Sequence, residues 1–392
     1  MGPTTREPEL VARLQGLGTT VFSEMTDLAI AHDAVNLGQG FPDENPPPAV
    51  LAAAVTAMEQ GHNQYAPGPG VASLRAAVAD HQRRFHALDY DPDDEITITF
   101  GATEAMSAAV QSLCEAGDEV VVLEPAYDAY RAVIALAGGV QRRVPVRGGD
   151  LRPDLDRLAA VVGPRTRLVI VNSPHNPTGL VYDAAELDEI ARLCVEHDLI
   201  AVTDEVYEHL VYEGEHQPLA GRPGMRDRTV TISSAAKTFS CTGWKVGWAC
   251  APPPLTRALR IVKQYATFSG ATPFQHAVAV GLAQDDDAYR RQLELLRGRR
   301  DRLCDGLEGL GLGVQRPQGT YFAVADVAPV GHDDAEDFCR WAPGAIGVAA
   351  VPVTAFVDAP APVRSLVRFA FCKPDAVIDA GLERLAALTE HR

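Results

Sequence analysis

Short β-branched runs alternate with longer helical patterns between about residues 95 and 250, and this alternation constrains the fold more than any other feature. The strand candidates are Ile96–Phe100, Val120–Leu123, Leu168–Val171, Ile200–Thr203, Thr229–Ile232 and Val246–Cys250. Between them, apolar residues recur at helical spacing in Thr103–Leu113 and Ala184–Glu196. Nearly continuous apolar strands are typical of parallel sheets that helices cover on both faces. The pattern therefore predicts an α/β fold built on a mostly parallel sheet.

The rest of the chain is arranged around this block. A length of 392 residues exceeds what a single core usually serves, since single cores stop growing at about 250–300 residues. Prolines 46–48 precede a helix expected at Ala49–Gln60, and a long Leu- and Arg-rich helix is expected after residue 287. Short strands are expected near the C-terminus, at Tyr321–Ala325 and Leu366–Phe371. We therefore expect a large domain (47–284), a smaller α+β domain (285–392), and an N-terminal segment (1–46) that joins the small domain.

The net charge of −17 at pH 7 argues against two classes of partner. Such a charge repels a nucleic-acid backbone and an anionic membrane surface, so we expect neither. The seven cysteines are scattered and contain no C-x-x-C pair, which favours a reducing cytoplasm. The first residues lack the apolar core of a signal peptide, and no apolar run is long enough to span a bilayer. Because the net charge is strongly negative, any anionic ligand must be held by local cations.

Polar residues with chemical potential follow several of the predicted strands. Asn176 lies just after the third strand, Asp204 and Tyr207 follow the fourth, and Lys237 lies in the loop between the last two. Open α/β sheets bind ligands at the carboxyl ends of their parallel strands, and a neutral lysine amine condenses with a carbonyl. Each residue alone also fits an ordinary role, such as a turn, a helix cap or a solvated lysine. Their joint occurrence in this order indicates a single site.

The motifs around these residues resemble those of the class-I aminotransferases of fold type I, and within them the N-succinyldiaminopimelate and kynurenine aminotransferase group. The resemblance spans nearly the whole chain and is carried by Asn36–Pro42, Asn63–Tyr65, Ser173–Gly179, Asp204–Tyr207, Lys237–Phe239, Gly243–Lys245 and Val367–Phe369. It implies pyridoxal 5'-phosphate as cofactor, an amino-acid donor, a 2-oxo acid such as 2-oxoglutarate as acceptor, and a homodimer with shared active sites. The expected function is transfer of an amino group.

The resemblance also assigns roles around the cofactor ring. Lys237 is expected to hold the cofactor as a Schiff base and to move the proton between the substrate α-carbon and the cofactor. Asp204 is expected to pair with the pyridine nitrogen, and Tyr207 and Asn176 to hydrogen-bond the phenolic oxygen. Tyr127 is expected to stack on the ring, although it also fits a core aromatic after a strand. The catalytic residues implied are Lys237, Asp204 and Tyr207.

Further roles concern the phosphate. The turn containing Ala102 and Thr103 opens a helix after the first predicted strand, and a helix N-terminus favours an anion. Ser234 and Lys245 are expected to complete the phosphate site, with Lys245 a point charge where relatives often have arginine. Tyr65 is expected to reach the phosphate of the neighbouring subunit.

The resemblance assigns substrate recognition to Arg368, which is expected to grip the α-carboxylate with two hydrogen bonds. Gly40 and Asn176 are expected beside that carboxylate, and Phe22 against the side chain of the donor. The segment Thr267–Phe274, which approaches the pocket from the neighbouring subunit in related enzymes, contains no arginine to pair with a second carboxylate. We therefore expect a bulky, long or acylated donor, of the N-succinyldiaminopimelate, kynurenine or methionine type, and not simply an acidic one.

Two alternatives of function stay open at this point. A cysteine-conjugate β-lyase shares the fold and the cofactor residues, and a non-catalytic ligand-sensing module uses the same fold. No metal is expected: the acidic run Asp89–Glu95 lacks the glycine and the final glutamate of a calcium loop. Arg297, Arg299, Arg300 and Arg302 are expected to form a solvated helix face.

Overall fold

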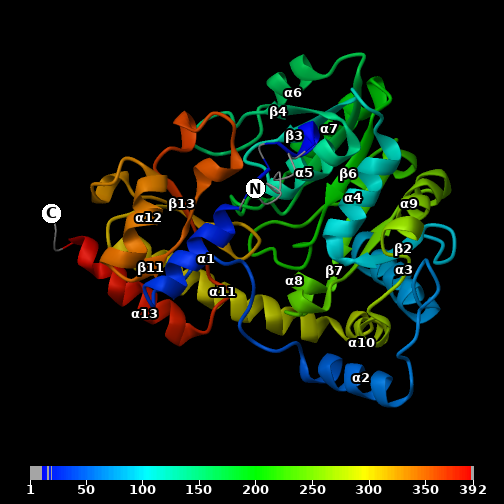
Figure 1. Cartoon of the computed structure of the whole chain (residues 1–392), viewed down its shortest axis with the longest axis horizontal. Coiled ribbons are helices and arrows are strands. Elements are labelled where there is room, and N and C mark those ends of the chain that lie inside the picture. Colours follow the sequence, from blue (N-terminus) through cyan, green and yellow to red (C-terminus); the bar gives the residue numbers. More distant parts are fainter. Residues whose placement is uncertain (1–10, 16, 19, 390–392) are drawn as a thin grey trace, which may run out of the picture.

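The computed structural model describes residues 11–15, 17–18 and 20–389, and a seven-stranded sheet forms the centre of its larger half (Figure 1). The strand order is β2-β8-β7-β6-β5-β3-β4. Their bounds are β2 (Ile96–Phe100), β3 (Glu119–Leu123), β4 (Val140–Val144), β5 (Thr166–Asn172), β6 (Ile200–Asp204), β7 (Thr229–Ser234) and β8 (Val246–Cys250). Only β8 runs antiparallel to its neighbours, β2 and β7. The prediction of an α/β fold with a mostly parallel sheet is confirmed.

The edge strand β4 was missed by the sequence analysis. Its central residues Gln141, Arg142 and Arg143 are polar, and alternate residues of the strand are exposed. An edge strand with polar side chains does not show the apolar run by which buried parallel strands are recognised.

Helices cover both faces of this sheet, because alternate residues of a strand point to opposite faces. Val120 and Val122 of β3 pack in one core with α4 (Gly101–Leu113), α5 (Asp128–Ala137) and α9 (Pro253–Ala266). The intervening Val121 and Leu123 pack in another core with α6 (Leu155–Val161) and α7 (Ala184–Glu196). Beyond β2 and β8, α3 (Ala72–His86) and α10 (Thr272–Leu282) add a third core, and α2 (Pro48–Glu59) packs on α10.

The smaller half combines the N-terminal segment with the last third of the chain, as the blue, orange and red ribbons of Figure 1 show. A four-stranded antiparallel sheet has the order β12-β13-β10-β9, with bounds β9 (Gly313–Gln315), β10 (Phe322–Asp326), β12 (Val351–Pro352) and β13 (Leu366–Ala370). The short strand β1 (Val35–Asn36) pairs in parallel with β11 (Val348–Ala349). The helices here are α1 (Val21–Ala31), α12 (Ala335–Ala345) and α13 (Asp375–Leu385). The backbone pairing of β1 with β11 joins the N-terminal segment to the last third of the chain.

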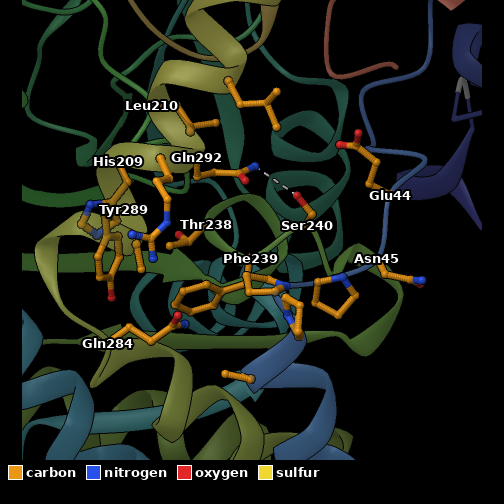
Figure 2. A pocket seen from close by; sticks show the side chains of 17 residues that line it. Glu44, Asn45, His209, Leu210, Thr238, Phe239, Ser240, Gln284, Tyr289 and Gln292 are labelled. Atoms are coloured by element: carbon orange, nitrogen blue, oxygen red, sulfur yellow. Dashed lines mark hydrogen bonds between the residues drawn. The ribbon is translucent and has the colours of Figure 1, made fainter. Parts of the chain in front are cut away.

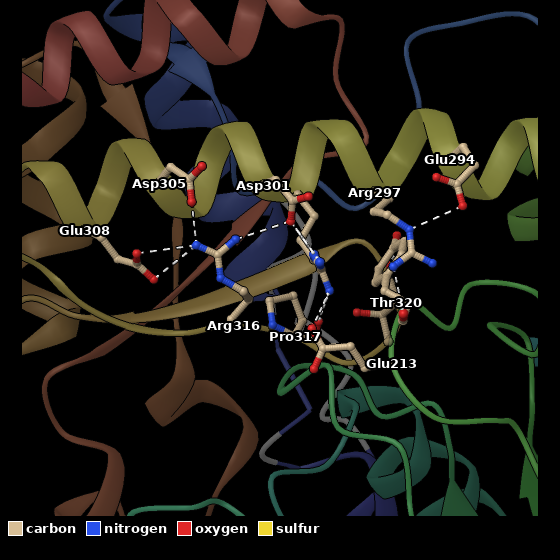
Figure 3. A network of polar contacts seen from close by, with 11 residues as sticks. Glu213, Glu294, Arg297, Asp301, Asp305, Glu308, Arg316, Pro317 and Thr320 are labelled. Atoms are coloured by element: carbon tan, nitrogen blue, oxygen red, sulfur yellow. Dashed lines mark hydrogen bonds and ion pairs between the residues drawn. The ribbon is translucent and has the colours of Figure 1, made fainter.

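The long helix α11 (Asp286–Gly309) runs between the two halves, and its arginines correct one expectation. Arg299 and Arg300 are only 6% and 5% exposed, not solvated. Arg299 pairs with Glu44 and Asp375, and Arg300 with Glu213 and Asp301, at 2.5–3.2 Å. Figure 3 shows the part of this network that contains Glu213 and Asp301, which continues to Arg316 and the acidic side chains along the helix. The expectation failed because segments distant in sequence pack over this face of α11 and supply the carboxylates.

No helix within the described ranges is long and apolar enough to cross a membrane.

Candidate active site

A cavity of about 880 Å³ opens at the carboxyl ends of β5, β6 and β7, where the larger and smaller halves meet. It gathers side chains that the sequence analysis predicted from distant segments. The predicted residues that line it are Phe22, Gly40, Ala102, Thr103, Tyr127, Asn176, Asp204, Tyr207, Ser234, Lys237, Lys245 and Arg368. The position agrees with the general rule that ligands of open α/β sheets bind beyond the carboxyl ends of the strands.

Lys237 lies on a single helical turn, α8 (Ala235–Thr238), where the sequence analysis expected a plain loop. Its Nζ donates a hydrogen bond of 3.3 Å to the carbonyl of Gly40. Burial lowers the pKa of the Lys237 amine to about 8. A substantial neutral fraction of this amine therefore exists near neutral pH, which a nucleophilic or proton-transferring lysine requires.

Asp204 ends β6 and opens into the same cavity. Its Oδ2 accepts a hydrogen bond of 2.7 Å from the hydroxyl of Tyr130, and its Oδ1 is 3.4 Å from the backbone nitrogen of Val206. Burial raises the pKa of Asp204, and the hydrogen bond from Tyr130 is the largest effect in the opposite direction. The ring of Tyr130 packs edge-on against that of Tyr127, with centroids 5.8 Å apart. The cavity thus contains a carboxylate held by a tyrosine that the sequence analysis did not predict.

The start of α4 forms a cradle for an anion. Gly101 opens the helix with φ +70°, and a Cβ at this position would lie 3.4 Å from Nζ of Lys245. A Cβ at Gly247 of β8 would come within 2.5 Å of the Gly101 carbonyl carbon, so glycine is required for this close approach. The helix N-terminus and the Lys245 ammonium therefore lie together, with Ser234 on the wall of the same cavity. This combination suits a phosphate group.

Arg368 of β13 is 1% exposed and enters the cavity from the smaller half. One Nη donates to Oδ1 of Asn176 at 2.8 Å and the other to the carbonyl of Gly38 at 2.9 Å. Its guanidinium lies 3.9 Å from the ring centroid of Phe322 and 5.2 Å from that of Phe22. Burial lowers the pKa of Arg368 to about 10, so it stays cationic at neutral pH. Its partners are neutral, which leaves its charge available to a carboxylate from solution.

Tyr65 is the one predicted site residue that does not line the cavity. Its side chain is 79% exposed, and its ring packs edge-on against Phe268, with centroids 5.6 Å apart. Within one chain, therefore, Tyr65 is not brought to the other site residues.

Asn172 is a second site residue that the sequence analysis missed. Its side-chain oxygen accepts from the backbone nitrogen of Asn176 at 2.8 Å, and its nitrogen donates to the carbonyl of Asp204 at 2.8 Å. Its place at the end of β5 was a usable signal, because polar residues at strand carboxyl ends carry sites of this kind. Nothing comparable marks Tyr130, which lies within a helix.

Behind the cavity, Glu208 joins two segments that carry site residues. Its carboxylate accepts a hydrogen bond from His86 at 2.6 Å and another from the hydroxyl of Ser233. Glu208 is adjacent to Tyr207, and Ser233 is adjacent to Ser234. This buried contact therefore holds the segment after β6 against the end of β7.

A second, smaller cavity of about 560 Å³ lies near α8, between the linker 44–49 and α11 (Figure 2). Thr238, Phe239 and Ser240 line it, and Gln292 of α11 donates to the Ser240 hydroxyl at 3.3 Å. The turn that carries Lys237 thus contributes residues to both cavities.

The donor set fits pyridoxal phosphate: an anion cradle, a carboxylate and a partly neutral lysine border one cavity. Together with the α/β fold, this site defines a fold-type I enzyme that depends on pyridoxal phosphate. The model of the aminotransferase class I and II family matches residues 32–385. The chain belongs to this family, and it is a pyridoxal-phosphate-dependent aminotransferase.

Individual relatives are similar over nearly their whole length. The structure of N-succinyldiaminopimelate aminotransferase from Mycobacterium tuberculosis is 50% identical, with a TM-score of 0.94, covering 97% of this chain and 100% of that one. Methionine aminotransferase from Escherichia coli is 39% identical over 96% of this chain and 98% of its own. Kynurenine–oxoglutarate transaminase 3 from Mus musculus is 37% identical over 95% of this chain and 88% of its own. The predicted family, cofactor and enzyme class are confirmed.

Proposed function

We propose that the protein transfers the amino group of a bulky, long or acylated amino acid to a 2-oxo acid such as 2-oxoglutarate. The observation that carries the proposal is a single cavity with a partly neutral lysine, a half-buried carboxylate and a buried guanidinium that has no carboxylate partner within the described residues. These three groups match the needs of a reaction that forms and moves charge at the α-carbon of a carboxylate-bearing substrate.

When bound, pyridoxal phosphate supplies an aldehyde for the amino group and a ring that takes up electrons from the substrate α-carbon. Lys237 would hold the cofactor through its amine nitrogen, and once the substrate amino group has displaced it, the freed amine would move the proton between the substrate α-carbon and the cofactor C4′. Asp204 holds the proton on the pyridine nitrogen, which keeps the ring able to accept electrons. Tyr207 donates a hydrogen bond to the phenolic oxygen, and Tyr127 stacks on the ring.

The remaining residues bind and orient. Thr103 and Ala102 at the start of α4 hold the phosphate together with Ser234 and Lys245. Arg368 binds the substrate α-carboxylate with its two Nη groups. The carboxylate then replaces the carbonyl of Gly38 as a partner of the guanidinium. The rest of this surface is proposed to consist of the side chain of Asn176, the backbone of Gly40 and the ring of Phe22.

The substrate range has two supports. The relatives are named for N-succinyldiaminopimelate, methionine and kynurenine, which share a bulky or extended side chain. The apolar rings of Phe22, Tyr127 and Phe356 lie near one another beside Arg368, and they suit such side chains better than a second carboxylate.

A donor screen tests this range. We expect kcat/KM for kynurenine, methionine or N-succinyldiaminopimelate, with 2-oxoglutarate as acceptor, to exceed that for aspartate. A clear preference for aspartate would overturn the proposed pocket. Release of pyruvate and ammonia from a cysteine conjugate, without any acceptor, would show β-elimination instead of transfer.

We also propose a homodimer with shared sites. Tyr65 is exposed within one chain, and so are Tyr265 (88%) and the apolar residues Leu51, Val55 and Met58 of α2. Exposed large apolar residues of this kind suit an interface between subunits. In the dimer, Tyr65 would reach the phosphate of the neighbouring subunit's cofactor.

Complementation tests the shared site. Co-expression of a Tyr65→Ala chain with a Lys237→Ala chain should restore partial activity, because one site of each heterodimer then carries neither change. Verified heterodimers without activity would contradict shared sites.

Two finer points complete the proposal. The seven cysteines are free and buried, which supports a reducing cytoplasm as the location. The division into an N-terminal segment (1–46), a large domain (47–284) and a small domain (285–392) is proposed as the domain organisation of the chain. Limited proteolysis with and without substrate would test the division by the protection of cleavage sites near residues 46 and 285.

A further inference from the structure

Tyr130 lines the wall of the cofactor cavity and has no role in the mechanism above. It belongs to the first turn of α5, and its side chain is 3% exposed. Its hydroxyl donates the 2.7 Å hydrogen bond to Oδ2 of Asp204. Burial and the neighbouring Asp204 carboxylate raise the pKa of the Tyr130 phenol well above its usual value. The hydroxyl therefore remains a donor at every pH at which the enzyme can work.

The contacts of Asp204 show what this donor does. Oδ1 has one weak contact, the Val206 backbone nitrogen at 3.4 Å, whereas Oδ2 is occupied by Tyr130. The occupied oxygen leaves Oδ1 as the more available acceptor for a ligand. The edge-on packing of Tyr130 against Tyr127 fixes the position of the donor. A buried carboxylate that lost this donor would take up a proton more readily, because hydrogen bonds to the charged form favour it.

We propose that Tyr130 is a positioning residue that keeps Asp204 ionised and directs its Oδ1 toward the pyridine nitrogen of the bound cofactor. The inference rests on the proposed role of Asp204. The competing explanation is that Tyr130 only fills space between α5 and the sheet. The two explanations differ in pH dependence, because a packing defect does not change the proton affinity of a carboxylate.

The test is Tyr130→Phe, which removes the hydroxyl and keeps the ring. Equilibrium dialysis gives the dissociation constant of pyridoxal phosphate between pH 5 and 9, and steady-state kinetics give kcat and KM. We expect cofactor affinity near pH 6 to fall about tenfold, the size typical of a hydrogen bond to a charged group. Without its donor, Asp204 becomes protonated at a higher pH. The pH midpoint at which cofactor affinity is lost on acidification should therefore rise by about one pH unit. We expect kcat to fall while the KM values change little, because Arg368 is untouched.

Controls separate this inference from the proposed function. Tyr90→Phe removes the hydroxyl of another buried tyrosine that does not line the cavity, and it should leave the pH profile unchanged. In an Asp204→Asn background, Tyr130→Phe should no longer shift the profile. A uniform loss of affinity at all pH values, or an equal shift in the Asp204→Asn background, would overturn the inference. If Asp204→Asn itself leaves cofactor affinity and turnover unchanged, the proposed role of Asp204 fails as well.

Discussion

Buried arginines in two regions of this protein differ in the charge of their partners. Arg368 in the cavity is 1% exposed and bonds to an amide oxygen and a carbonyl, whereas Arg299 of α11 is 6% exposed and bonds to two carboxylates. Burial lowers the pKa of Arg368 to about 10, and the Glu44 carboxylate raises that of Arg299. A buried cation with neutral partners still attracts an anion from solution, and a neutralised one contributes to structure. The partners, and not the burial, distinguish the two regions.

Two lysines repeat the contrast. Lys237 has one long hydrogen bond to a carbonyl at 3.3 Å, while Lys373 is 4% exposed and lies 2.7 Å from the Asp43 carboxylate. Variants of the cavity cations should therefore lose activity and keep their stability. Variants of the carboxylate-paired cations should lose stability and keep their activity.

The largest effect is expected for Lys237→Ala. Removal of the proton-transferring amine should lower the transamination rate by about 10³-fold, the middle of the range for general acid–base groups. The melting temperature of the cofactor-free protein should not fall, because the variant removes an amine that burial disfavours. Lys373→Ala should lower the melting temperature and keep turnover near that of the wild type. Similar losses of activity in both variants would break the comparison.

A smaller effect on catalysis is expected for Arg368→Lys. A lysine keeps the charge and loses the two parallel donors, so kcat/KM for donor and acceptor should fall about 10²-fold, as expected when a buried charge pair is impaired. Arg299→Lys is the matched change in the carboxylate-paired set, and its kcat/KM should stay unchanged. Equal sensitivity at the two positions would show that burial alone decides.

The rate at which the cofactor-free protein captures pyridoxal phosphate should change about tenfold with pH. The pKa of Lys237 is lowered to about 8, and only the neutral amine attacks the cofactor aldehyde. The rate of capture by cofactor-free protein should therefore rise from pH 7 to pH 9 with a midpoint near 8, gaining about tenfold as the neutral fraction grows from roughly a tenth to nine tenths. Stopped-flow absorbance measures this rate. A flat profile over this range would contradict the lowered pKa.

The smallest effect on activity belongs to Arg299→Leu. Its partners Glu44 and Asp375 are 40% and 54% exposed, so water resolvates them once the arginine is gone. We expect a loss of about 1–2 kcal/mol in the free energy of unfolding, between the values for surface and buried ion pairs. Turnover at saturating substrate should stay unchanged. Denaturant titration measures the loss, and a large fall in kcat without a stability change would reverse the assignment of this residue to structure.

Most of the predicted site residues line one cavity, and the sequence could point to them because they follow strands that are recognisable from local sequence. Asp204, Asn176 and Lys237 each come after an apolar run, and motifs around them identify a family. Tyr130 had no such signal: it lies on a helix, 74 residues before its partner Asp204. The solvated face expected for the α11 arginines was wrong at Arg299 and Arg300 for the same reason, since Glu44 and Glu213 reach them from remote segments, whereas Arg302 is exposed as expected.

Local periodicity by itself predicted the α/β class of this protein, and the resemblance of its motifs to a known family implied the cofactor and the family. They could do so because strand and helix periods depend on near neighbours, and because the carboxyl ends of parallel strands meet at one edge of a sheet. Only the tertiary structure decided which buried cations have carboxylate partners and which oxygen of Asp204 bonds to Tyr130. Those outcomes depend on hydrogen bonds between segments far apart in the chain, and the desolvation that gives these bonds their strength exists only after the two halves have packed.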